Sequence, residues 1–162
     1  MPLFLRNPAF YLLITFVLTA PAAAQVAPSA LPTPEEFAGF PIGSEGNLVR
    51  WEKIVAYYRL VAESSDRVRV EELGKSTNGN PFILATISSP RNLARLAEIR
   101  TNQWKIAHPN ELGDDEGQEL IWNSPAVALM TCNIHATEIG SSQMALELVH
   151  RMATEDSPWM RN

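Results

Sequence analysis

The most apolar run after the first 24 residues, "PAVALMTCNI" at residues 125–134, constrains the fold more than any other feature of the chain. A continuous apolar run of this length predicts a strand that is buried on both faces, as in the centre of a sheet. The residues that follow repeat apolar side chains at three- and four-residue spacing, which predicts an amphipathic helix from about Ile139 to Met152. A strand that leads into a helix in this way is typical of an α/β fold.

A helix and a hairpin are expected before this strand. After Ser44, a plausible N-cap, apolar residues at helical spacing predict an amphipathic helix of about 18 residues. The segment "RVRVEELG" at residues 67–74 alternates as a strand, and "FILATISS" at residues 82–89 is apolar enough for a second strand. Asn78-Gly79 lies between them and predicts a hairpin turn, because both residues tolerate positive φ.

A second helix and a loop separate the hairpin from the apolar run. Pro90 is suited to a first helical turn, and the apolar spacing continues to about Trp104. The polar, acidic segment "HPNELGDDEGQE" at residues 108–119 predicts a surface loop, and its spacing does not match an EF-hand. The expected order is therefore helix, hairpin, helix, strand, helix, which is an α/β arrangement.

The N-terminal residues predict an export signal and a leader. Arg6, the apolar stretch "FYLLITFVLTA" and the small residues of "PAAAQ" predict a signal peptide over residues 1–24, cleaved after Ala24. The apolar stretch is shorter than the ~20 residues that span a bilayer, so we expect a secreted or periplasmic protein with no membrane attachment after cleavage. An uncleaved anchor is the alternative. The proline-rich residues 25–43 predict an extended leader, and residues 44–162 form the predicted domain.

Composition excludes several classes of function. Hydrophobic residues make up 46% of the chain and charged residues 19%, which indicates a globular protein. A net charge of −5 argues against a nucleic-acid partner, and the oligomeric state stays open. The single cysteine, Cys132, cannot form an internal disulfide. At the end of an apolar strand it is expected to be a buried small side chain, with a reactive thiol as the alternative.

The four residues "HATE" follow the predicted strand and contain a candidate metal site. His135 and Glu138 supply the nitrogen and oxygen ligands that zinc accepts, and a tight turn between them would let both side chains converge. Ligands of α/β proteins bind at the carboxyl ends of strands, where this pair is expected to lie. The alternative is a Glu138 favoured by the helix dipole, with His135 hydrogen-bonded nearby.

Two blocks of the sequence resemble the zinc carboxypeptidase family, the metallocarboxypeptidases related to carboxypeptidases A and B. "PAVALMTCNIHATEIGSSQMALELVHRM" resembles its zinc motif, a strand followed by His-x-x-Glu and a helix. "YYRLVAESSDRVRVEELGKSTNGNPFILATIS" resembles its early helix and hairpin. The resemblance covers roughly residues 47–162 and implies the N-terminal part of a catalytic domain, with a mixed β-sheet flanked by helices.

The resemblance implies that His135 and Glu138 are the first two protein ligands of one Zn²⁺ ion. The family's third ligand, a histidine, is expected beyond residue 162, as are its general-base glutamate and the arginine that binds the substrate carboxylate. No catalytic residue is therefore expected within these 162 residues. His150 lies 12 residues beyond Glu138, about 18 Å along a helix, and cannot reach the ion. His108 precedes the strand, and nothing points to it as a ligand.

The implied function is that of an exported zinc metallocarboxypeptidase acting on peptide or protein substrates, with this fragment alone inactive. Two departures leave the substrate preference open: Thr137 replaces the motif's usual arginine, and Cys132-Asn133 replaces a common Gly-Gly pair. One alternative is a zinc deacylase or amidase of the related fold. Another is a secreted, non-catalytic binding module that has lost the site.

Overall fold

The computed structural model describes residues 31–158, and the predicted signal peptide lies outside this range. Helices and a small sheet make up the described chain, which confirms the α/β class. None of the helices between residues 31 and 158 combines the length and hydropathy needed to cross a bilayer. The elements are, in order, α1 (Pro34–Ala38), α2 (Trp51–Ser64), β1 (Val68–Lys75), β2 (Pro81–Ile87), α3 (Pro90–Ala94), α4 (Leu96–Ala107), the 3₁₀ helix η1 (Pro109–Glu111), α5 (Asp114–Asn123) and α6 (Ile139–Thr154).

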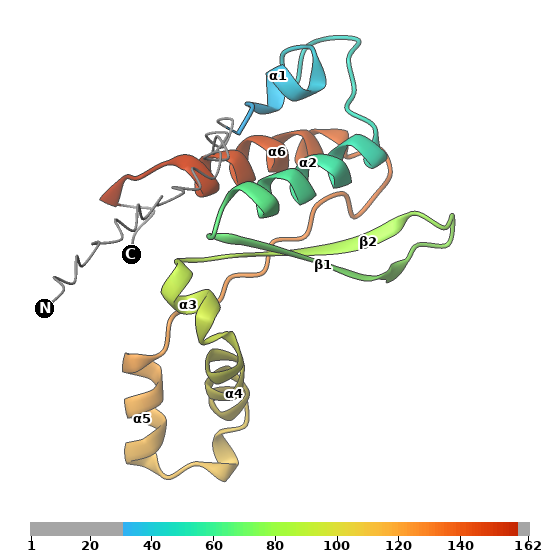
Figure 1. Ribbon diagram of the computed structural model, residues 1–162. Helices are drawn as coiled ribbons and strands as arrows, with labels where there is room; N and C mark the ends of the chain where they lie inside the picture. The colour runs from blue at the N-terminus through green and yellow to red at the C-terminus, as the bar shows by residue number, and fades with distance from the viewer. Residues whose placement is uncertain (1–30, 159–162) are drawn as a thin grey trace, which may run out of the picture.

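The core forms where α2 and α6 lie side by side above the β1–β2 hairpin (Figure 1). Tyr57 and Val61 of α2 and Leu146 and Val149 of α6 have at most 1% of their surface exposed. Burial of a large apolar side chain contributes about 1.5–3 kcal/mol, so these four residues make the contact between the two helices strongly stabilising. The apolar spacing that predicted both helices therefore marks the faces that meet.

The hairpin has the strands and the turn that the sequence predicts. β1 and β2 pair antiparallel, with Val68 opposite Ile87. The turn is closed by hydrogen bonds from Ser76 N–H to the Asn80 carbonyl oxygen (2.8 Å) and from Gly79 N–H to the Ser76 carbonyl oxygen (2.9 Å). Only Gly79 of the Asn-Gly pair has positive φ, 78°, because a single left-handed residue is enough to reverse the chain here.

The start of α2 differs from the prediction. The helix begins at Trp51 and not after Ser44. Gly43 and Gly46 have φ values of 81° and 76°, a left-handed conformation that a right-handed helix excludes. Residues 44–47 form turns instead, and the indole N–H of Trp51 donates to the Pro81 carbonyl oxygen (3.0 Å), which ties the first turn of α2 to the hairpin.

The prediction of an extended leader is wrong over α1. Thr33 caps this short helix through a reciprocal pair of hydrogen bonds with Glu36, and Pro34 occupies its first turn. Ala38 is buried in the core, and the ring of Phe37 lies 5.0 Å from that of Tyr57. Local capping chemistry thus forms a helix in a segment whose prolines suggested extended chain.

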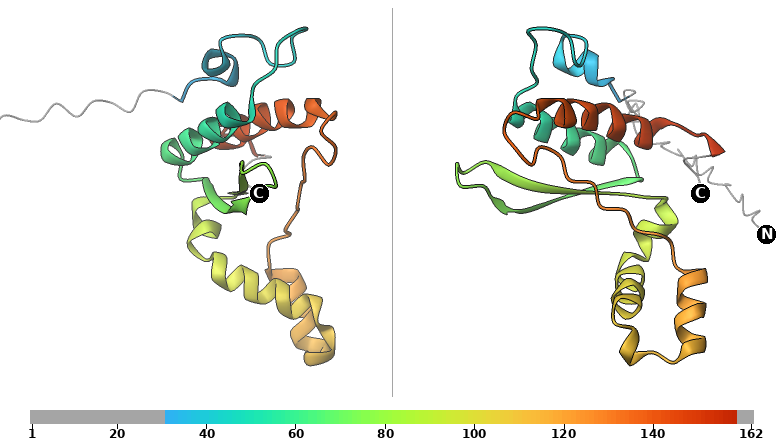
Figure 2. Two further views of the ribbon diagram at one scale, coloured as in Figure 1. Left: turned by 90° about the vertical axis from the view of Figure 1, so that its right-hand side faces the viewer. Right: turned by 180° about the vertical axis from the view of Figure 1, so that it is seen from behind.

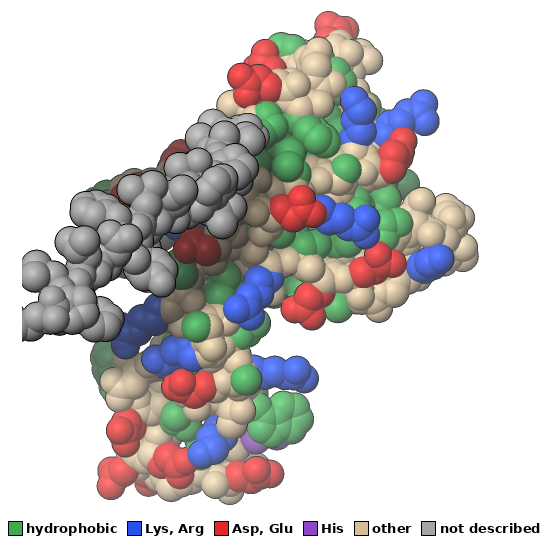
Figure 3. Space-filling model, viewed as in Figure 1, with side chains coloured by type: hydrophobic (Ala, Val, Ile, Leu, Met, Phe, Trp, Pro, Cys, Tyr) green, Lys and Arg blue, Asp and Glu red, His purple; other side chains and the backbone are tan. Residues whose placement is uncertain are grey.

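The region between the hairpin and the apolar run is more helical than predicted. The helix expected from Pro90 is broken at Arg95 into α3 and α4, and α4 continues to Ala107. The expected loop ends at Asp114, where α5 begins. Three acidic residues stabilise its first turn because they lie at the positive end of the helix dipole, and they gather at the far end of the projecting α4–α5 pair (Figure 3).

The central strand predicted at residues 125–134 does not form. These residues run from α5 to α6 as a single extended segment that pairs with neither β1 nor β2 (Figure 2). Val127, Leu129 and Ile134 are 66%, 80% and 75% exposed. An apolar run becomes a buried strand only when neighbouring strands bond to it, and the described chain contains no third strand. Residues 125–134 therefore have the composition of a buried strand, but within the described chain they lack the neighbouring strands that would bury them.

A buried amide links the two central helices at the end that carries the "HATE" turn. The side-chain oxygen of Gln143, on α6, accepts from Val49 N–H (3.2 Å), and its side-chain nitrogen donates to the Val49 carbonyl oxygen (3.4 Å). Gln143 is 5% exposed, and Val49 immediately precedes the cap of α2. These two bonds fix the entry of α2 against the first turns of α6.

Replacing Gln143 by Ala is expected to lower the free energy of unfolding by about 1–3 kcal/mol, because both backbone polar groups of Val49 would remain buried without partners. Urea unfolding followed by circular dichroism measures the change. Gln118→Ala is the control, since Gln118 lies on the exposed surface of α5. Equal stability of the two variants would show that the buried amide does not hold α6 in place.

Candidate metal centre

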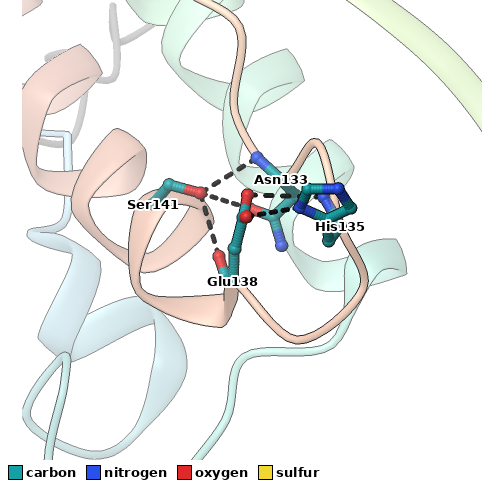
Figure 4. Close-up of polar contacts among 4 residues, drawn as sticks. All are labelled: Asn133, His135, Glu138 and Ser141. Carbon is teal, nitrogen blue, oxygen red and sulfur yellow. Dashed lines mark hydrogen bonds and ion pairs between the residues drawn. The ribbon is translucent and has the colours of Figure 1, made fainter.

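The turn before α6 brings His135 and Glu138 together, as the sequence predicts. The His135 Nδ1–H donates to Glu138 Oε1 at 2.6 Å, and the backbone N–H of His135 donates to Glu138 Oε2 at 3.3 Å (Figure 4). A backbone bond from Glu138 N–H to the His135 carbonyl oxygen (3.1 Å) closes the turn between them. The side chains are 74% and 49% exposed, so both are open to an ion from solution.

The hydrogen bonds from His135 lower the pKa of the Glu138 carboxyl below its usual value, because they stabilise its ionised form. Glu138 is also the N-cap residue of α6, at the positive end of the helix dipole. Both effects favour the ionised carboxylate, which is the form that could act as a metal ligand.

The two ligand atoms are near the separation that zinc requires. Zinc bonded to a nitrogen and an oxygen at ~2.0–2.2 Å in tetrahedral geometry holds these atoms about 3.4 Å apart. His135 Nδ1 and Glu138 Oε1 are 2.6 Å apart, which is somewhat closer than this separation. The donor types and their convergence fit zinc. The same hydrogen bond is also what the alternative predicts, in which His135 and Glu138 have a purely structural role. The geometry is therefore compatible with both interpretations.

Asn133 and Ser141 form hydrogen bonds at the two ends of this turn. The Ser141 hydroxyl accepts from the backbone N–H of Asn133 (3.0 Å) and lies 2.6 Å from Asn133 Oδ1 and 3.0 Å from the Glu138 carbonyl oxygen (Figure 4). Asn133 has a φ of 57° and is the one non-glycine residue with positive φ in the described chain. Asparagine tolerates this conformation better than most residues, which explains how it replaces a glycine of the motif.

Sequence reasoning did not identify Ser141 as part of the site. The available signal was a serine in the first turn of the helix after the motif, a position where hydroxyls commonly bond to nearby backbone groups. That signal does not reveal the contact with Asn133, which depends on the path of the preceding turn.

The other two histidines lie away from this turn. His150 Nδ1 is 2.9 Å from the hydroxyl of the buried Tyr57, which itself donates to the Pro32 carbonyl oxygen (2.8 Å). The His108 ring stacks on Trp104, with ring centres 3.9 Å apart, at the end of α4. Between residues 31 and 158, no three histidine, cysteine or acidic side chains gather as a metal site. Within the described part of the chain, the structure therefore brings together the two predicted ligands and no third.

The prediction that Cys132 is buried is wrong, because the strand expected to enclose it does not form. Its side chain is exposed, and so is that of Thr137 in the turn between His135 and Glu138.

Comparison with known protein families identifies the family of the chain. The model of the family described as zinc carboxypeptidase matches residues 54–162, about two thirds of the chain. The chain belongs to the zinc carboxypeptidase family. No curated protein and no solved structure matches it. The match includes the hairpin, the turn with His135 and Glu138, and α6.

We expect Zn²⁺ to bind this zinc carboxypeptidase chain weakly, because a catalytic zinc site normally has three protein ligands and the described chain supplies two. A zinc titration followed by ¹H–¹⁵N NMR should move the amide signals of residues 135–141, and His135→Ala should abolish these changes. His108→Ala is the control and should leave them intact. Tight stoichiometric binding lost in His135→Ala would contradict the expectation of a missing ligand.

Proposed function

We propose that the chain is the metal-binding N-terminal part of an exported, zinc-dependent carboxypeptidase that hydrolyses the C-terminal peptide bonds of peptides and proteins. The observation that carries the proposal is the convergence of His135 and Glu138 at 2.6 Å within a turn that the zinc carboxypeptidase family model covers. Export is supported by the sequence of residues 1–24, which has the charge, apolar stretch and cleavage site of a signal peptide.

In this proposal His135 and Glu138 hold the ion, and the rest of the machinery comes from chain beyond residue 162. A bound zinc ion polarises a substrate carbonyl and makes a bound water acidic. His135 would supply a ring nitrogen and Glu138 a carboxylate oxygen, and the lowered pKa of the Glu138 carboxyl favours the ionised form that binds a metal. The exposure of both side chains leaves room for a further ligand, a water molecule and the substrate.

The preference for substrate side chains is left open by this site. Thr137 occupies the position of the arginine that contacts peptide in the digestive enzymes, and it carries no charge. A deacylase or amidase acting on a related carbonyl substrate would use the same two metal ligands. The choice between these activities depends on residues outside the metal-bearing turn.

The test is a comparison of two proteins. The 162-residue chain is expected to release no C-terminal amino acid from a peptide panel, because the described residues bring no third metal ligand to the pair. A version extended by the downstream coding sequence is expected to release C-terminal residues, and His135→Ala should abolish that activity. Mass spectrometry of the peptides measures both.

The outcomes separate the alternatives. Release of acyl groups without shortening of any peptide would favour the deacylase. A folded, extended protein that binds no zinc and hydrolyses neither class of substrate would favour a binding module and contradict the proposal.

A further inference from the structure

The hydroxyl of Ser141 contacts both ends of the turn that carries the metal pair. It accepts the backbone N–H of Asn133, two residues before His135, at 3.0 Å. It also lies within donating distance of Asn133 Oδ1 (2.6 Å) and of the Glu138 carbonyl oxygen (3.0 Å). A hydroxyl has one proton and two acceptor positions, so it can serve the entry and the exit of the turn at once or alternate its donation between them.

These contacts matter because zinc would remove the other interaction that shapes the turn. An ion held between His135 Nδ1 and Glu138 Oε1 would take the place of the hydrogen bond that now joins these atoms. The bonds from Ser141 involve no metal ligand atom, so they persist in the bound state. They also stabilise the positive φ of Asn133, a conformation that is uncommon for any residue with a Cβ atom.

Ser141 is itself held in place by the core. It lies in the first turn of α6, two residues before Gln143, whose buried amide is bonded to Val49. The contact of α2 with α6 therefore fixes the position of Ser141. The hydrogen bonds of Ser141 in turn fix the position of the turn.

We propose that Ser141 is a positioning residue for the metal pair, which acts with Asn133 to fix His135 relative to Glu138. That the pair binds zinc rests on the proposed function. That Ser141 holds the turn in place does not depend on it. Groups that orient metal ligands typically change metal affinity by about 10–100-fold when they are removed. Ser141→Ala should leave α6 intact, because alanine is the strongest helix former.

The experiment uses two NMR measurements on the full 162-residue chain. The first is amide hydrogen exchange of His135 without metal. This N–H donates to Glu138 Oε2 and does not touch Ser141, so its exchange rate reports the geometry of the turn. The second is the Kd for Zn²⁺ from the shifts of amides in the turn.

Two variants complete the design. Ser142→Ala is the matched control, because the Ser142 hydroxyl makes the same kind of bond within α6, to the Ile139 carbonyl oxygen at 3.1 Å, and has none to the turn. Ser141→Thr keeps a hydroxyl at the same position and should rescue the loss.

The expected result is faster exchange of the His135 amide and a Kd for Zn²⁺ raised about 10–100-fold in Ser141→Ala, with wild-type behaviour in Ser142→Ala and Ser141→Thr. Unchanged exchange and affinity in Ser141→Ala, or equal effects in Ser142→Ala, would overturn the proposal. Faster exchange of His135 in a chain whose wild type binds no zinc would support the positioning role and contradict the proposed function.

Discussion

The packing of α6 against α2 is the interaction on which the rest of the structure depends. Tyr57 and Leu146 are almost completely buried in it, and the hairpin, α1 and the first turn of α6 are all placed relative to this contact. Glu138 caps α6 and Ser141 lies in its first turn. The turn that joins His135 to Glu138 therefore takes its position from a hydrophobic core, where the buried amide of Gln143 bonds to Val49. Destabilising the core should disturb the site before it disturbs the distant α4–α5 pair.

Local patterns predicted much of the fold, and they failed where structure depends on distant partners. The alternation at β1 and the Asn78-Gly79 turn led correctly to a hairpin, and apolar spacing led correctly to α6. Residues 125–134 were predicted as a central strand because their composition suits burial. A strand requires neighbours that bond to its backbone, and no pattern within the run can show whether they are present. The exposure of Cys132 follows from the same error.

The convergence of His135 and Glu138 could be predicted from the sequence, whereas the contacts of Asn133 and Ser141 with their turn could not. A histidine and a glutamate three residues apart are recognisable because their types and spacing carry the chemistry. Asn133 was seen as a departure from a glycine pair, and the structure shows why it is tolerated: it adopts the left-handed conformation that glycine favours. Ser141 contributes through a single hydroxyl whose partners depend on how the turn folds back on α6. The family match begins within α2, so α1 and Val49 support the core from outside the matched region.

Zinc X-ray absorption spectroscopy of the zinc-loaded chain tests the central claim most directly, because it identifies the ligand atoms of the ion. Coordination by His135 and Glu138 predicts a shell of nitrogen and oxygen atoms at about 2.0–2.2 Å, with one imidazole contribution and the remaining positions filled by water. A sulfur atom at about 2.3 Å would instead place the ion on Cys132. That result, or scattering from more than one imidazole, would contradict the claim that these two residues form the metal centre.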